Sequence, residues 1–82
     1  MKFSAVVEIS GLAGIADPEG QTIERSLPAL GFDHVEHVRV GKLIRFEIEA
    51  ADKPAALEQC DELCRKLLAN PVIERYDVAV TP

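Results

Sequence analysis

Two helix starts of the same kind, near residues 17 and 52, divide this chain into alternating strand and helix segments. Asp17 can accept a hydrogen bond from a free backbone N–H as an N-cap, and Pro18 at the first helical position has no N–H to leave unpaired. Glu19 suits the positive end of the helix dipole. Asp52-Lys53-Pro54 repeats the arrangement, so each proline marks where a helix begins.

Each predicted helix carries one apolar stripe, which indicates that it buries a single face. The stripe of the first helix comprises Ile23, Leu27 and Leu30. We expect Gly31 to end this helix and Pro28 to kink or loosen its last turn. The second helix ends at Asn70-Pro71, because a residue before proline disfavours the α region. Its stripe comprises Leu57, Cys60, Leu63, Cys64, Leu67 and Leu68, and its solvent face carries the pairs Asp61–Arg65 and Glu62–Lys66.

Alternation of side chains with a period of two predicts the strands. Residues 3–9 and 72–80 are the first and last strands, and residues 34–40 and 43–49 predict a hairpin between them. The apolar faces of the two hairpin strands can coincide only with an odd-length loop, Gly41-Lys42-Leu43, or with a bulge beside Gly41.

The expected fold is α+β: a two-layer β-α-β-β-α-β domain over residues 1–82, with a small antiparallel sheet and two helices on one face. This element order is ferredoxin-like. The second face of the sheet is not purely polar, because it would carry Val6, Val35, Leu43, Ile73 and Ala79. Exposed apolar patches mark interfaces, and domains of this size often gain stability by oligomerising. We therefore expect a homo-oligomer that buries part of this face.

Charge and hydropathy exclude several functional classes. The net charge is −5, the bases form no patch or stripe, and aromatic residues are scarce, so nucleic acid is not expected as a partner. No apolar run approaches the roughly 20 residues that span a bilayer. Glu8 also interrupts the apolar stretch that a signal peptide would need. We expect a cytoplasmic protein with no membrane partner and with reduced cysteines.

No set of side chains makes a convincing catalytic, cofactor or metal site. Cys60 and Cys64 lack the further ligands of a structural zinc site, and burial as small hydrophobes explains them. Ser10 lies in no nucleophile elbow, although His34 and His37 follow it in the chain. The glycines before the first helix match neither phosphate-loop pattern. We expect no cofactor, no metal and no catalytic centre.

Two segments have both a structural and a functional interpretation. Arg39-Val40-Gly41-Lys42 is a basic tip in an acidic chain. Arg39 can clamp a carboxylate or phosphate there, or the charges can simply discourage aggregation at a sheet edge. Residues 67–74 form an apolar run with a turn in its middle. That run fits a helix end packed on a strand start, or a docking surface for a partner protein.

These segments, in this order and over nearly the full length of the chain, resemble the PurS family. The matching pieces after the opening strand are Asp17-Pro18-Glu19-Gly20, Leu30-Gly31-Phe32, Val38-Arg39-Val40-Gly41-Lys42 and Leu67-Leu68-Ala69-Asn70-Pro71-Val72-Ile73-Glu74-Arg75-Tyr76. The chain departs from the family in Pro28, in its two cysteines, and in lacking a basic residue within Ser10-Gly11-Leu12-Ala13-Gly14.

The resemblance implies a non-catalytic accessory subunit of phosphoribosylformylglycinamidine synthase, a glutamine-hydrolysing C–N ligase complex of de novo purine biosynthesis. Such a subunit joins the large synthase subunit to the glutaminase subunit, can assist ammonia transfer, and forms a homodimer or homotetramer. The candidate partner-binding residues are Asp17, Pro18 and Gly20 at the helix start, Arg39, Gly41 and Lys42 at the basic tip, and Leu68, Asn70, Pro71 and Glu74 in the 67–74 segment.

Two other functions fit the same element order. A small-ligand-binding regulatory module of ferredoxin-like, ACT-like shape would also dimerise, and an amino acid or nucleotide would stabilise it. A small oligomeric enzyme would instead place His37 or Arg39 at a subunit interface.

Overall fold

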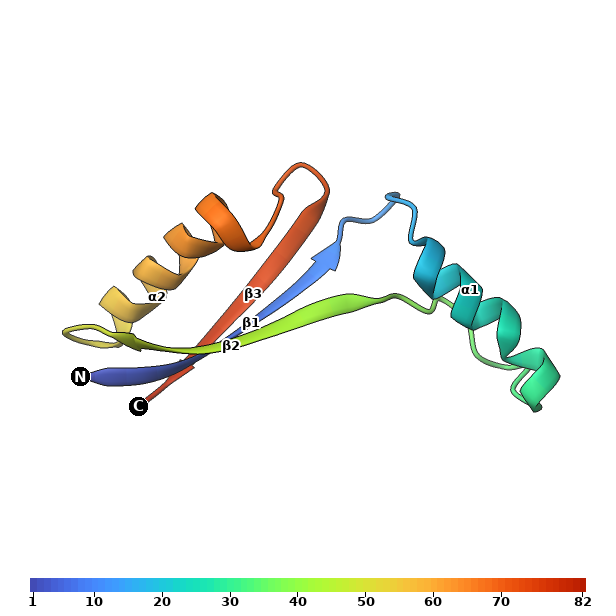
Figure 1. Cartoon of the computed structure of the whole chain (residues 1–82), viewed down its shortest axis with the longest axis horizontal. Coiled ribbons are helices and arrows are strands. Elements are labelled where there is room, and N and C mark those ends of the chain that lie inside the picture. The colour runs from blue at the N-terminus through green and yellow to red at the C-terminus, as the bar shows by residue number, and fades with distance from the viewer.

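The computed structural model describes all 82 residues as a three-stranded antiparallel sheet with two α-helices (Figure 1). The central strand β1 (Lys2–Gly11) pairs with β2 (Gly41–Glu49) on one side and with β3 (Glu74–Thr81) on the other. The helices are α1 (Pro18–Ser26) and α2 (Lys53–Leu63). The expected α+β class, a small antiparallel sheet with two helices, is confirmed. Neither helix is long and apolar enough to cross a membrane.

The core lies between α2 and one face of the sheet, and the period-two pattern of β1 creates it. Phe3, Ala5, Val7 and Ile9 are each at most 2% exposed, because alternate side chains of a strand point to the same face. Cys60 of α2 packs with Phe3 and Ala5 in one apolar cluster. Further along the helix, the buried Cys64 packs with Val7 and Ile9 in a second.

Both predicted helix starts are confirmed. The Asp52 carboxylate accepts a hydrogen bond of 2.9 Å from the Ala55 amide, and Asp17 caps α1 in the same way. Pro28 begins a short 3-10 turn, Pro28–Leu30, which ends at Gly31 in the left-handed conformation. The expected loosening of the last turn at Pro28 is therefore confirmed.

The end of the second helix differs from the simple stripe. Residues Cys64–Leu68 form a π-helical turn, closed by a 3.0 Å hydrogen bond from the Ala69 amide to the Cys64 carbonyl. A π turn inserts an extra residue, so side chains within and beyond it no longer follow the 3.6-residue period. Leu67 is 75% exposed in consequence, although the stripe predicts it to be buried.

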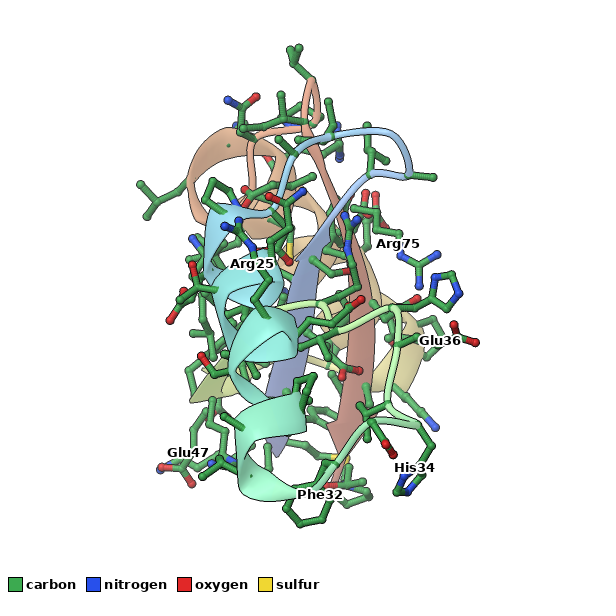
Figure 2. All side chains as sticks on the ribbon, turned by 90° about the vertical axis from the view of Figure 1, so that its right-hand side faces the viewer. Arg25, Phe32, His34, Glu36, Glu47 and Arg75 are labelled. Atoms are coloured by element: carbon green, nitrogen blue, oxygen red, sulfur yellow. The ribbon has the colours of Figure 1, made fainter.

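Residues 12–40, here called the arm, extend away from the sheet and carry α1 with them (Figure 1). The radius of gyration is 16.4 Å, whereas a compact chain of this length would have about 12 Å. Within α1 only Gly20 is buried. The expected placement of both helices on one face is therefore not observed, since α2 alone covers the sheet. Figure 2 shows Phe32 and His34 at the far end of the arm.

The predicted hairpin between residues 34–40 and 43–49 is wrong. Residues 34–40 form no strand, and Gly41 and Lys42 lie inside β2 instead of in a turn. The reason is that β1 extends far enough to pair with them, Ser10 opposite Gly41 and Ile9 opposite Lys42. A side chain at position 41 would place its Cβ 2.6 Å from the Ile9 carbonyl oxygen, which explains the glycine.

The outer face of the sheet, opposite α2, is more polar than expected. Val6, Leu43 and Ala79 lie on it among charged and hydroxyl side chains, whereas Val35 and Ile73 lie outside the strands. Most of the exposed large apolar side chains are on the arm and in the 67–74 segment. Most of the exposed apolar surface from large side chains therefore lies outside the sheet.

Candidate functional site

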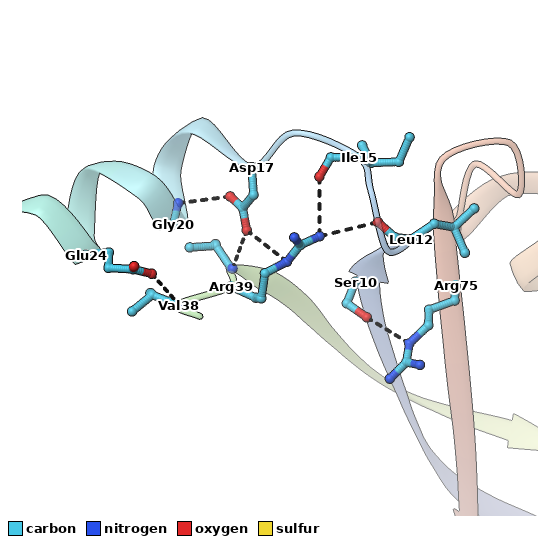
Figure 3. Close-up of polar contacts among 10 residues, drawn as sticks. Ser10, Leu12, Ile15, Asp17, Gly20, Glu24, Val38, Arg39 and Arg75 are labelled. Atoms are coloured by element: carbon cyan, nitrogen blue, oxygen red, sulfur yellow. Dashed lines mark hydrogen bonds and ion pairs between the residues drawn. The ribbon is translucent and has the colours of Figure 1, made fainter. Parts of the chain in front are cut away.

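Asp17 fastens the start of α1 to the segment that leads into β2 (Figure 3). One carboxylate oxygen accepts a 2.9 Å hydrogen bond from the Gly20 amide, and the other accepts a 2.8 Å bond from the Val40 amide. These backbone bonds, Val40 first and then Gly20, together with the Arg39 guanidinium lower the pKa of the Asp17 carboxyl. The helix cap predicted from the sequence thus also makes a tertiary contact.

A second contact, about two turns further along α1, completes this attachment. The Glu24 carboxylate accepts a 2.9 Å hydrogen bond from the Val38 amide. The two backbones approach so closely that a Cβ at Gly20 would lie 2.5 Å from the Val38 carbonyl oxygen. We call the group Asp17, Gly20, Glu24, Val38 and Val40 the clasp, because it holds the two halves of the arm together.

Arg39 lies beside the clasp and not at the tip of a hairpin. Its Nε is 3.7 Å from the Asp17 carboxylate. One terminal nitrogen donates long hydrogen bonds of 3.4 and 3.5 Å to the Leu12 and Ile15 carbonyls (Figure 3). The guanidinium therefore ties the loop after β1 to the segment that leads into β2.

Residues 67–74, here called the corner, form a rigid turn between the end of α2 and β3. The Asn70 side chain accepts a bond from the Val72 amide, and the Asn70 amide donates to the Glu74 carboxylate at 2.8 Å. The Asn70 carbonyl in turn accepts from the Glu74 amide at 2.7 Å. This network holds Val72, which is 78% exposed, in a fixed position on the surface.

The corner and the arm meet at one end of the sheet. The Leu12 amide donates a 2.9 Å bond to the Ile73 carbonyl, which joins the start of the arm to the corner. A pocket at this end is lined by Asp17, Gly41, Lys42 and Glu74, four of the predicted partner-binding residues. Leu68, Asn70 and Pro71 lie in the corner, and Pro18 and Gly20 lie on α1. The structure thus gathers candidates from three separate segments around one end of the sheet.

Several polar contacts have no signal in the sequence. The Tyr76 hydroxyl donates a 2.6 Å bond to Asp61, which raises the pKa of the tyrosine and lowers the pKa of the acid. Arg75 Nε lies 3.4 Å from the Ser10 hydroxyl oxygen. In the sequence, only the acidic character of Glu24 suggests that it belongs to the clasp. These contacts join residues 14 to 65 positions apart, so only the folded chain reveals them.

The cysteines and histidines do not gather into a site. Burial raises the pKa of the Cys60 and Cys64 thiols, so both remain protonated and unreactive near neutral pH. His34 and His37 are exposed on the arm, 3.8 Å from Asp33 and Glu36 respectively. Neither histidine lies near Ser10 in a hydrogen-bonded arrangement.

Comparison with known proteins gives a consistent family. The family PurS, described as phosphoribosylformylglycinamidine (FGAM) synthase, matches residues 4–82. The PurS subunit of that synthase from Methanocaldococcus jannaschii is 41% identical over 78 residues, 95% of this chain and 94% of that protein. The Thermotoga maritima subunit is 38% identical over 76 residues, 93% of each chain.

Solved structures agree along the whole chain. The M. jannaschii PurS crystal structure superposes with a TM-score of 0.85 at 40% identity, over 96% of this chain and 95% of that one. A chain in the structure of PurLQS from T. maritima gives a TM-score of 0.89 at 36% identity, over 99% of both chains. The arm, the sheet and the corner are thus shared features, and the chain belongs to the PurS family.

Proposed function

We propose that this chain is the accessory PurS subunit of phosphoribosylformylglycinamidine synthase, without a catalytic centre of its own, in purine biosynthesis. The observation that carries the proposal is the match to a chain of PurLQS over 99% of both lengths. In this role the chain joins the large synthase subunit to the glutaminase subunit. By holding the two in a fixed relation it assists transfer of ammonia between them.

The corner is the surface that fits a partner subunit best. Leu67 and Val72 are 75% and 78% exposed, and Ile73, next to Val72 in the chain, is 41% exposed. Backbone and side-chain hydrogen bonds from Asn70 and Glu74 hold the turn in shape, so little conformational freedom is lost on docking. Rigid, exposed apolar side chains surrounded by polar groups are the usual centre of a protein interface.

The arm supports a further part of the proposal, that the chain is a homodimer or homotetramer. Isolated helices shorter than about 12 residues are marginal in water, and α1 has nine residues with only Gly20 buried. Ile23, Leu30 and Phe32 are 42–70% exposed. On β2, Ile44, Phe46 and Ile48 are only half-buried, so the same chain offers both an uncovered helix and an incompletely covered sheet. A second copy of the chain can cover both the helix and the exposed part of the sheet.

An omission experiment tests the function directly. The large synthase subunit and the glutaminase subunit are assayed for glutamine-dependent synthesis with and without this chain, and the mass of the complex is measured in parallel. We expect both activity with glutamine and the joint complex to require the chain, while activity with added ammonia persists without it. Unchanged glutamine-dependent activity and complex mass on omission would refute the proposal.

A further inference from the structure

The outer face of the sheet holds a polar pocket of about 350 Å³ at the end where the arm begins. Its lining includes two rows of side chains. They are neighbours on this face because they lie two residues apart along the strands. The first row is basic and hydroxylic, with Ser10 on β1 opposite Arg75 on β3. The second row is acidic, with Glu8 opposite Asp77. Opposite charges thus lie in adjacent rows of one face.

The basic row has unused hydrogen-bond donors. Arg75 makes no ion pair, and its only side-chain bond is the long one from Nε to the Ser10 hydroxyl oxygen (Figure 3). Since that oxygen accepts, the Ser10 O–H remains free to donate, as do the terminal nitrogens of Arg75. Lys42 also contributes to the lining, but it pairs with Ile9 in the register, so its side chain belongs to the other face of the sheet. A planar guanidinium with a neighbouring hydroxyl is well suited to a carboxylate.

The acidic row lacks a positively charged partner. Glu8 and Asp77 face each other across the two strands, and neither forms an ion pair. Like charges directly opposite one another in a sheet are destabilising. A cation placed between them would relieve that repulsion, and an ammonium group can donate to both carboxylates.

The two rows are also spaced for one small ligand. Residues two apart on a strand are separated by about 6.7 Å, and no ion pair joins Arg75 to Asp77 across that distance. An α-amino acid carries its carboxylate and ammonium on one carbon, so it can bond to each row with one hydrogen-bond length at either end. We propose that this pocket binds a free α-amino acid, with Ser10 and Arg75 holding the carboxylate and Glu8 and Asp77 holding the ammonium.

Glycine is the simplest probe of this proposal, and its two halves serve as controls. Amide shifts of Ser10, Arg75 and Asp77 are followed by NMR during titrations with glycine, acetate and methylammonium at constant ionic strength. We expect saturable shifts confined to the pocket with glycine, and about fivefold weaker responses to acetate and to methylammonium, because each contacts one row only. Acetate acting as strongly as glycine would leave only an anion site and overturn the proposal.

Charge-neutral variants test each row. Arg75→Gln and Asp77→Asn are each expected to weaken glycine binding about fivefold, and Glu8→Gln serves as an independent second variant of the acidic row. Lys2→Gln, at the opposite end of the same face, is the matched control and should leave binding unchanged. Binding retained or tightened in both acidic-row variants would contradict the proposal. The isolated chain is used throughout, so the result is independent of whether the synthase complex assembles.

Discussion

The sheet and α2 form the body of the molecule, and residues 12–40 form the arm. The two regions differ in how far each buries its own apolar side chains. In the body, apolar side chains on β1 are at most 2% exposed because α2 covers them. In the arm, α1 has the capping residues of a stable helix but buries only Gly20. Favourable capping residues therefore do not guarantee that a helix buries its apolar face. We therefore expect the arm to gain stability when a second copy or a partner subunit covers α1.

The largest expected difference separates Ile9→Ala in the body from Ile23→Ala in the arm. Ile9 is 1% exposed and Ile23 is 42% exposed. Removing the buried side chain should cost about 3 kcal/mol of unfolding free energy, and removing the exposed one less than about 1 kcal/mol. Urea denaturation of the dilute chain measures both.

Protein concentration sharpens this contrast. If a second copy covers α1, the cost of Ile23→Ala should rise at concentrations where the oligomer forms, because association adds to stability by mass action. Equal costs for the two variants in the dilute chain would remove the distinction between body and arm.

Gly20→Ala tests the contact that keeps the arm folded back on itself. The new Cβ would lie 2.5 Å from the Val38 carbonyl oxygen, so we expect a loss of about 2 kcal/mol from steric displacement. Gln21→Ala, on an exposed position of the same helix, is the control. A gain of about 1 kcal/mol at position 20, as helix propensity alone would give, would show that the clasp does not constrain α1.

Asp17→Asn should loosen the clasp in a pH-dependent way. The folded-state pKa of Asp17 is lowered, so its stabilising effect is present above the unfolded carboxyl pKa of about 3.9 and is lost as pH falls through the folded value. NMR of the Gly20 and Val40 amides should therefore show the wild-type clasp weakening in acid. The asparagine variant should be looser already at neutral pH, without that acid transition. Identical pH profiles for the two proteins would contradict this role.

Leu67→Ser should have the smallest effect on the isolated chain, within about 0.5 kcal/mol, because the side chain is 75% exposed. We expect it instead to weaken binding to the other synthase subunits about tenfold. Leu30→Ser, 70% exposed on the arm, is the matched comparison and should impair self-association more than partner binding. Sedimentation of the chain alone and in the complex separates the two outcomes.

The helix starts and the first strand could be predicted from residues close together in the sequence. The extent of β2 depends on pairing between distant segments, which the sequence alone does not reveal. The caps at Asp17 and Asp52 and the buried alternation from Phe3 to Ile9 depend on neighbours in the sequence, and all are confirmed. The sequence predicts Gly41 in a turn because nothing in its own segment reveals that β1 continues opposite it. It predicts Leu67 in the buried stripe because a π turn leaves no clear signal in the residues that form it.

The candidate site shows the same division. Asp17 was identifiable as a helix cap, but its bond to Val40 and the proximity of Arg39 depend on how the arm folds back. Arg75 and Ser10 belong to separate strands, and only the register of β1 with β3 places them together. Motifs along the chain therefore identified the candidate segments, and the structure shows which contacts each side chain makes.

Hydrogen exchange of this chain, dilute and alone and then within the complex with the large and glutaminase subunits, tests the account most directly. We predict that amides of α1 exchange rapidly in the dilute chain, that corner amides exchange more slowly because hydrogen bonds within the turn already hold them, and that both become more protected in the complex, while those of β1 are protected in both states. Equal exchange of α1 and the corner in the two states would contradict the claim that these surfaces perform the accessory role.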